Sequence, residues 1–288
     1  MIFSSETVAH QWGKTVNVSE QTSLNKLGKA VAKPLSRLLA NPRTEQLSLL
    51  ADAYLCILLG KGAGSGWALD VEVKAAASVI HHQSPVIFDV GANTGEWSLA
   101  IRQHCPEAAR LFLFEPQPAC QKIIENSRIP NSILIPHAVS SSSGKTIELF
   151  VGKEASGLAS LHQRRDSYFD AIDFSVIEVK TVTIDDIVEE HGIDRVDLLK
   201  MDVEGHELSV LEGAIQSLQR GKIKALTFEF GSGNINSRTF FHDFWDLLTP
   251  LGFRIFRVLP SGRLMLIANY YEDCEYFRGV SNYVAILQ

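Results

Sequence analysis

The sequence is poor in the residues that cross-link, anchor or strongly charge a protein. Its 288 residues include four cysteines, which lie far apart and form no Cys-x-x-Cys pair, so neither a zinc knuckle nor a redox pair is predicted. Lysine and arginine are dispersed without a basic block, and the net charge is -6, which argues against nucleic acid as a partner. The most apolar window, residues 47–59, is interrupted by Asp52 and is too short to span a bilayer.

The amino terminus also lacks the positively charged start and the apolar core of a signal peptide. Cysteines without an evident pairing pattern are usual in a reducing compartment. With 45% hydrophobic and 21% charged residues, the composition is that of an ordinary globular protein. We therefore expect a soluble, cytoplasmic protein that makes no contact with a membrane.

What the sequence does contain is a regular alternation of strand-like and helix-like segments after residue 85. Such alternation predicts an α/β fold whose parallel sheet is covered by helices on both faces. Near the carboxyl terminus three more strands are expected, at residues 254–259, 263–268 and 283–287, with a hairpin turn at Pro260-Ser261-Gly262. The expected earlier strands are residues 86–90, 111–115, 133–137, 196–201 and 225–230, and the helices between them are 94–104, 119–126, 206–220 and 239–251.

Two domains are predicted. Residues 1–80 form a helical extension, with helices over residues 36–59 and 68–81, and residues 81–288 form the main domain. The main domain carries an insertion at about residues 141–182, in which two strand-like runs surround a polar loop. Thr183 after it is a predicted helix N-cap, with acidic residues in the first turn at the positive end of the helix.

The most informative segment is the strand at residues 86–90 and the glycine turn that follows it. Its spacing is Gly-x-x-x-Gly, from Gly91 to Gly95, rather than the Gly-x-Gly-x-x-Gly of a dinucleotide site. Ligands of open parallel sheets bind at the carboxyl ends of the strands. Asp89, Gly91, Asn93 and Gly95 are therefore candidate ligand contacts, since small residues expose backbone and the next helix offers free N–H groups. The alternative is a tight turn without a ligand.

An acidic residue, Glu115, ends the second predicted strand and precedes Pro116. A carboxylate at that position accepts both hydroxyl groups of a ribose, and each charge-assisted hydrogen bond contributes about 1.5–3 kcal/mol. A simple charge at a helix start is the other interpretation. The glycine turn one unit earlier favours the ribose.

A third cluster of candidates follows the fourth predicted strand. Lys200, Asp202 and Glu204 lie two residues apart, so an extended strand places them on one face. Three charges on one face of an apolar strand are costly to bury without partners, which indicates a functional site. Asp202 is the main catalytic candidate, and structural roles stay open for Glu204. His206 is a candidate proton acceptor or a plain helix-start residue, and Glu229 ends the fifth strand.

In this order, these segments resemble the FkbM-type methyltransferases, enzymes that use S-adenosyl-L-methionine and have a Rossmann-like class I methyltransferase fold. The resemblance runs from about residue 85 to the end of the chain. It rests on Phe-Asp-Val-Gly-Ala-Asn-Thr-Gly-Glu at 88–96, Phe-Glu-Pro at 114–116, Ala-Val-Ser at 138–140, Thr-Ile-Asp at 183–185, Leu-Lys-Met-Asp-Val-Glu-Gly-His-Glu at 199–207 and Asn-Tyr at 282–283.

The resemblance implies a role for each motif. Glu115 and Pro116 would contact the ribose of the cofactor, and the turn at Ala138 and Val139 would flank the adenine. Asp202 would lie beside the sulfonium and the acceptor. Where relatives often carry an acid, this chain has a serine run at 140–143, so the adenine contact is expected from backbone. The methionine part would be held by Asp89, Gly91, Ala92, Asn93 and Gly95.

The expected reaction is O-methylation of a small-molecule acceptor, a sugar or natural-product hydroxyl, without a metal. The insertion, together with Phe244 and Trp245, is expected to shape the acceptor pocket, although it could simply cover a sheet edge. An NAD-dependent oxidoreductase and a non-catalytic cofactor-binding scaffold remain alternatives, as does a divalent ion on Asp202 and Glu204. For residues 1–80 a lid, a pocket wall and a homodimer contact all stay open. The insertion's aromatic and polar side chains are His162, Arg164, Arg165, Tyr168 and Phe169.

Overall fold

A computed structural model describes residues 26, 28–36, 41–62, 69–152, 159–162 and 174–288. The chain divides into two compact units, Met1–Tyr54 and Leu55–Gln288. Residues 28–36 are helical, and helix α2 (Pro42–Leu58) begins at a proline, whose fixed φ suits a first helical turn. Over these described ranges, none of the helices combines the length and apolarity that crossing a bilayer requires.

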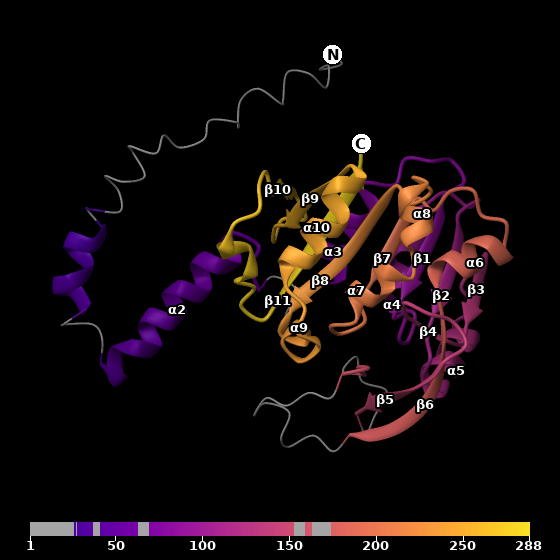
Figure 1. Ribbon diagram of the computed structural model, residues 1–288, viewed down its shortest axis with the longest axis horizontal. Coiled ribbons are helices and arrows are strands. Elements are labelled where there is room, and N and C mark those ends of the chain that lie inside the picture. Colours follow the sequence, from indigo (N-terminus) through magenta and orange to yellow (C-terminus); the bar gives the residue numbers. More distant parts are fainter. Residues whose placement is uncertain (1–25, 27, 37–40, 63–68, 153–158, 163–173) are drawn as a thin grey trace, which may run out of the picture. The chain divides into compact units, whose positions relative to one another are not determined.

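The second unit is built on an eight-stranded sheet with the order β10-β9-β11-β8-β7-β1-β2-β3 (Figure 1). The five strands from β8 to β3 are parallel, and β11, β9 and β10 pair in antiparallel fashion. This confirms the predicted Rossmann-like fold with a carboxyl-terminal antiparallel hairpin, which turns at residues 259–263. The strands are β1 (Val86–Val90), β2 (Arg110–Phe114), β3 (Ser132–Ile135), β7 (Leu198–Met201), β8 (Ala225–Gly231), β9 (Phe253–Val258), β10 (Leu264–Leu266) and β11 (Val280–Leu287).

Helices cover both faces of the main sheet, because successive side chains of each strand point to opposite faces. In β1, Ile87 packs with α3 (Leu69–Ala77), α4 (Glu96–Arg102) and α5 (Pro118–Ser127). Phe88 packs on the other side with α6 (Ile184–Glu190), α7 (Glu207–Glu212), α8 (Ile215–Gln219) and α10 (Phe241–Leu248). Burying each large apolar side chain contributes about 1.5–3 kcal/mol, so the two layers fix the strands that carry the site.

The strand order reverses next to β1. The chain passes from β1 to β2 and β3 on one side, and β7 and β8 lie on the other side. In an open α/β sheet, ligands bind at such a reversal, outside the carboxyl ends of the two strands. Here those ends are followed by Gly91 and Asp202.

The insertion forms a second sheet of three strands, in the order β4-β6-β5. Its strands are β4 (Ala138–Val139), β5 (Thr146–Val151) and β6 (Ser175–Val182), and β6 curves beneath the main sheet in Figure 1. The two predicted strand-like runs are confirmed. The segment at Ala138 is a short strand rather than a plain turn, because it pairs with residues 181–182. Arg164, Arg165, Tyr168 and Phe169 lie outside the described residues.

Two helix predictions need correction. The helix expected at 206–220 is divided into α7 and α8 at Gly213, because the Asp185 carboxylate accepts the N–H groups of Gln216 and Ser217 and starts a new helix there. Helix α9 (Ser232–Ser237) was not predicted, and the helix expected at 239–251 is α10 followed by a 3-10 turn, η1 (Thr249–Leu251). The N-cap prediction is confirmed, since Thr183 Oγ1 accepts the Asp186 N–H.

Candidate functional site

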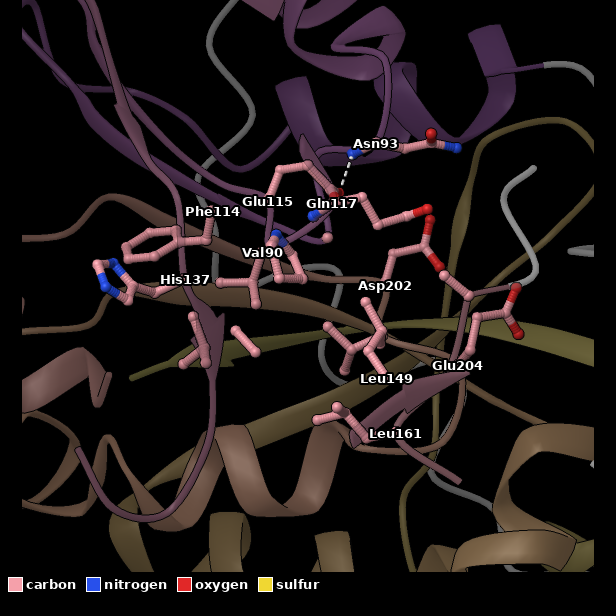
Figure 2. Close-up of a pocket in the computed structure, with 16 residues that line it drawn as sticks. Val90, Asn93, Phe114, Glu115, Gln117, His137, Leu149, Leu161, Asp202 and Glu204 are labelled. Carbon is pink, nitrogen blue, oxygen red and sulfur yellow. Dashed lines mark hydrogen bonds between the residues drawn. The ribbon is translucent and has the colours of Figure 1, made fainter. Parts of the chain in front are cut away.

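A pocket opens at the strand-order reversal, and its empty space, part of which is open solvent, is about 620 Å³. Figure 2 shows Glu115 and Asn93 along one side and Leu149 and Leu161 along the opposite side. The pocket therefore joins the ends of β1, β2 and β7 to the small sheet of the insertion. Its lining residues are Val90, Gly91, Asn93, Phe114, Glu115, Pro116, Gln117, His137, Ala138, Val139, Leu149, Ala159, Leu161, Asp202, Val203 and Glu204.

The Glu115 carboxylate is fixed by two backbone N–H groups. Its Oε2 accepts the N–H of Asn93 at 2.8 Å, and its Oε1 accepts the N–H of Gln117 at 2.8 Å. The Gln117 side chain also hydrogen-bonds this carboxylate, so only part of the acceptor capacity of the two oxygens remains for a ligand. Burial raises the pKa of Glu115 to about 7, although the hydrogen bonds from Gln117 and Asn93 lower it in part.

The glycine turn after β1 brings two backbone segments unusually close. Gly91 has φ +79°, and a Cβ placed on it would lie 1.9 Å from the carbonyl oxygen of Asp202, so any larger residue is excluded here. The Gly91 and Ala92 N–H groups donate to the Phe114 carbonyl oxygen. The Asn93 N–H donates to Glu115, so the N–H groups of all three residues 91–93 are already hydrogen-bonded. A ligand at this turn would therefore contact backbone without receiving a free N–H donor from it.

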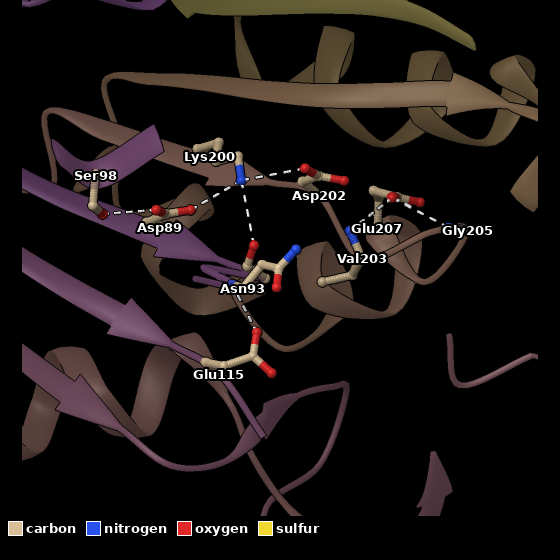
Figure 3. A network of polar contacts seen from close by, with 10 residues as sticks. Asp89, Asn93, Ser98, Glu115, Lys200, Asp202, Val203, Gly205 and Glu207 are labelled. Carbon is tan, nitrogen blue, oxygen red and sulfur yellow. Dashed lines mark hydrogen bonds and ion pairs between the residues drawn. The ribbon is translucent and has the colours of Figure 1, made fainter. Parts of the chain in front are cut away.

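Beneath this turn, the Lys200 ammonium group holds three oxygen atoms together (Figure 3). It lies 3.0 Å from Asp89 Oδ1, 3.4 Å from Asp202 Oδ2 and 3.4 Å from the Gly91 carbonyl oxygen. Ser98 Oγ donates to the other oxygen of Asp89 at 2.7 Å. Burial alone would lower the pKa of Lys200, but the attraction of Asp89 and Asp202 outweighs it and raises that pKa. The charged network therefore ties β1 to β7 below the pocket.

The segment after β7 does not continue as a strand. β7 ends at Met201, and Glu204 adopts a left-handed conformation with φ +53°, so the expectation that Lys200, Asp202 and Glu204 share one strand face is wrong for Glu204. The buried Glu207 carboxylate forms the turn by accepting the N–H groups of Val203 and Gly205, each at 3.2 Å. Asp202 and Glu204 nevertheless both line the pocket.

His206 is not among the residues that line the pocket. Its Nε2 lies 3.0 Å from Ser140 Oγ, and its Nδ1 lies 3.2 Å from Nε2 of His162 in the insertion. Burial and the neighbouring His162 lower the pKa of His206 to about 4. A ring that is neutral at pH 7 and hydrogen-bonded through both nitrogens is suited to positioning the turn and the insertion.

Eight of the twelve predicted site residues line the pocket, and four do not. Asp89, Ala92, Gly95 and His206 are not among the residues that line the pocket. Phe244 and Trp245, expected in an acceptor pocket, pack in the hydrophobic core instead, with Phe244 stacked on Phe228. The prediction did not name Gln117 or His137, and it expected the insertion to shape an acceptor pocket without naming Leu149, Ala159 or Leu161, which line this one. The eight that line the pocket are Gly91, Asn93, Glu115, Pro116, Ala138, Val139, Asp202 and Glu204.

Comparison with known proteins matches residues 89–255 to the FkbM methyltransferase domain. The chain belongs to this family. The match begins at Asp89 of the glycine-turn motif and includes Glu115 and the acidic segment after β7. Eleven of the sixteen residues that line the pocket lie in the motifs that carry the FkbM resemblance, and the other five are Gln117, His137, Leu149, Ala159 and Leu161.

Two relatives of this FkbM protein are named as methyltransferases, one for a sugar acid and the other for a 2-O position. The hexuronic acid methyltransferase AglP of Haloferax volcanii is 32% identical over 140 residues, covering 48% of this chain and 53% of AglP. The 2-O-methyltransferase NoeI of Sinorhizobium fredii is 31% identical over 158 residues, covering 51% of this chain and 64% of NoeI. The matched regions therefore span between half and two thirds of these relatives.

Among solved structures, an rRNA methylase of Streptococcus thermophilus has a TM-score of 0.41 and 9% identity, covering 75% of this chain and 95% of that one. Structural similarity at this level gives no information about the function of this FkbM protein.

Proposed function

We propose that this protein transfers a methyl group from S-adenosyl-L-methionine to a hydroxyl oxygen of a sugar or another small natural product. The observation that carries the proposal is Glu115, a buried carboxylate that lines the pocket and is fixed there by the N–H groups of Asn93 and Gln117. Membership of the FkbM family supports methyl transfer as the reaction. The names of AglP, a hexuronic acid methyltransferase, and NoeI, a 2-O-methyltransferase, support a hydroxyl of a sugar as the acceptor.

The residues present fit the cofactor. The acceptor capacity that Glu115 retains is suited to the hydroxyl donors of a ribose. Val139, Leu149 and Leu161 give the pocket an apolar wall suited to a purine. Gly91, Asn93 and Asp202 line the same pocket, so they are placed to contact the methionine part. When bound, S-adenosyl-L-methionine supplies a methyl group that its sulfonium already activates.

The protein's own contribution is positioning and removal of a proton. Alignment of an acceptor oxygen can supply about 7–11 kcal/mol of the barrier. Asp202 lines the pocket, and its Oδ2 is held 3.4 Å from Lys200 Nζ, so it is placed to orient an acceptor hydroxyl and to accept its proton. A general base contributes about 10²–10⁴-fold. Glu204 is the second pocket acid, and His206 acts here as a positioning residue.

The test measures transfer of a labelled methyl group from S-adenosyl-L-methionine to acceptors in a cell extract. The wild-type protein is expected to label a small molecule, and Asp202→Asn to do so at least about 10²-fold more slowly, while the affinity for S-adenosylhomocysteine changes little. The exposed acid Asp194 gives a matched control, Asp194→Asn, which should retain the wild-type rate. If Asp202→Asn transfers the methyl group at the wild-type rate, Asp202 is not the general base. Tight cofactor binding without any transfer would favour a scaffold.

A further inference from the structure

Residues 159–162 of the insertion contact both the pocket and the acidic turn after β7, with alternate side chains. Ala159 and Leu161 line the pocket, whereas Ser160 and His162 do not. Ser160 pairs with Phe150 of β5 through two backbone hydrogen bonds, of 2.9 and 3.0 Å, so the chain is extended there. Successive side chains of an extended chain point to opposite sides. One side of this segment is therefore pocket wall, and the other side faces the turn.

The Ser160 hydroxyl holds the carbonyl group of Glu204. Its Oγ donates to that carbonyl oxygen at 3.0 Å and accepts the N–H of His162 at 3.1 Å, and Ser160 is 2% exposed. Glu204 has φ +53°, a left-handed conformation that a residue other than glycine keeps only where its surroundings hold it. On the other side of the turn, a Cβ on Gly205 would lie 2.5 Å from the Gly233 carbonyl oxygen. The turn is thus held from both sides.

A second contact joins the same two segments through two histidine rings. His162 Nε2 lies 3.2 Å from His206 Nδ1, and His206 Nε2 lies 3.0 Å from Ser140 Oγ. One N–H group lies between the two rings. If it belongs to His206, Ser140 donates to His206 Nε2, and if it belongs to His162, His206 donates to Ser140. Either arrangement satisfies the facing nitrogens while both rings stay neutral.

Burial favours this neutral state. It lowers the pKa of His162, and burial together with the neighbouring His162 lowers the pKa of His206 to about 4. Two imidazolium rings at this distance would repel each other, whereas two neutral rings share a hydrogen bond. The contact between the insertion and the turn is therefore intact at pH 7.

Every member of this hydrogen-bonded chain is next to the pocket lining in the sequence. Ser140 directly follows β4, both residues of which line the pocket, and His162 directly follows Leu161. His206 ends the turn of residues 202–206, whose first three residues also line the pocket. The chain therefore connects three separate parts of the lining from behind.

We propose that Ser160 and His162 are positioning residues for the cofactor: they fasten the wall formed by Ala159 and Leu161 to the turn of Glu204, and so set how long S-adenosylhomocysteine stays bound. The proposal rests on the proposed function, because that function assigns the apolar wall to the purine of the cofactor. Neither Ser160 nor His162 lines the pocket, so each acts on binding through the segments that it joins.

The first test measures the dissociation rate of S-adenosylhomocysteine from the full chain by surface plasmon resonance. Ser160→Ala and His162→Ala should each release it about two- to tenfold faster, the effect of one lost hydrogen bond. His162→Gln keeps an amide that can bond to His206, so it should restore part of the wild-type rate. His104→Ala, at an exposed position, is the control and should release it at the wild-type rate.

A double variant separates a shared contact from two independent effects. If His162 and His206 act through their mutual hydrogen bond, His162→Ala with His206→Ala should release S-adenosylhomocysteine no more than about twofold faster than His206→Ala alone. Hydrogen exchange on the unliganded chain adds a signature in the partner segment. His162→Ala should raise exchange at residues 203–206, which it does not alter, and leave exchange in β2 unchanged.

Wild-type dissociation rates in Ser160→Ala and His162→Ala, additive effects in the double variant, or unchanged exchange at residues 203–206 would each overturn the proposal and leave methyl transfer intact. Urea unfolding checks that each variant folds. Because His162 is only partly buried, His162→Ala keeps the test decisive if Ser160→Ala does not fold. Failure of the wild-type protein to bind S-adenosylhomocysteine would instead overturn the proposed function.

Discussion

The Lys200 ammonium group lies 3.0 Å from the Asp89 carboxylate, and both side chains are almost completely buried. This ion pair joins two neighbouring parallel strands directly below the pocket, since Asp89 and Lys200 are register partners in β1 and β7. The same ammonium group also contacts Asp202. The position of the proposed base is therefore coupled to the integrity of the core.

Lys200→Met is expected to destabilise the protein strongly. Removing one member of a buried ion pair leaves the other charge without compensation, which costs about 3–5 kcal/mol. Urea unfolding at pH 7 measures the change in the free energy of unfolding. Lys180→Met, at an exposed position, is the control and should lie within about 0.5 kcal/mol of wild type. The double variant Lys200→Met with Asp89→Asn should recover part of the lost free energy of unfolding. If Lys200→Met unfolds at the same urea concentration as the control, the pair is not structural.

The affinity for S-adenosylhomocysteine should rise as the pH increases from 6 to 8. Glu115 has a pKa of about 7 without ligand, and its ionised form accepts ribose hydroxyl groups more strongly than its protonated form does. Titration calorimetry at several pH values measures the trend. Glu115→Gln should bind more weakly and lose this dependence. A Glu115→Gln protein whose affinity follows the wild-type pH curve would show that another group titrates.

Glu207 should make the wild-type protein less stable as the pH rises. Burial raises the pKa of Glu207 to about 8 in the folded state, above its ordinary value of 4.5. Between these values the folded state binds more protons than the unfolded state, so the free energy of unfolding falls with rising pH, by up to about 1.4 kcal/mol per pH unit for one group. The effect is absent below pH 4.5 and complete above pH 8.

Glu207→Gln removes this titration while keeping a side-chain oxygen for the N–H groups of Val203 and Gly205. Urea unfolding at pH 5, 7 and 9 should therefore give a smaller loss of stability for the variant than for wild type. Parallel pH dependence in the two proteins would contradict the buried, protonated state assigned to Glu207.

Gly91→Ala is expected to abolish binding of S-adenosylhomocysteine. Its Cβ would lie 1.9 Å from the Asp202 carbonyl oxygen, so β1 and β7 must separate at the pocket. Gly144→Ala provides the matched control, because Gly144 has nearly the same φ, +76°, with nothing within 4 Å of a new Cβ. Gly144→Ala therefore introduces the backbone strain of a left-handed residue, about 1–2 kcal/mol, without a steric clash at the new Cβ. Equal affinity in the two variants would show that close approach at Gly91 is unimportant.

Much of the fold was predictable because its signals are local. The strand at residues 86–90, the glycine turn and the N-cap at Thr183 each depend on a few consecutive residues, and the structure confirms them. The division between α7 and α8 was not predictable in this way. It depends on Asp185, which belongs to α6 and starts α8 from a distance of about thirty residues along the chain.

The site shows the same limit. Glu115 and Asp202 stand at strand ends in recognisable motifs, so the sequence indicated them, and both line the pocket. The apolar wall from Leu149 and Leu161 depends on how the insertion folds back, for which no local pattern exists.

The central claim is that the pocket between Glu115 and Asp202 binds an adenosyl thioether. Isothermal titration of the purified full-length chain with S-adenosylhomocysteine, alongside NADH, tests it most directly. We predict saturable binding of one S-adenosylhomocysteine per chain, weakened in Glu115→Gln, and no binding of NADH. Absence of S-adenosylhomocysteine binding, or a preference for NADH, would contradict it.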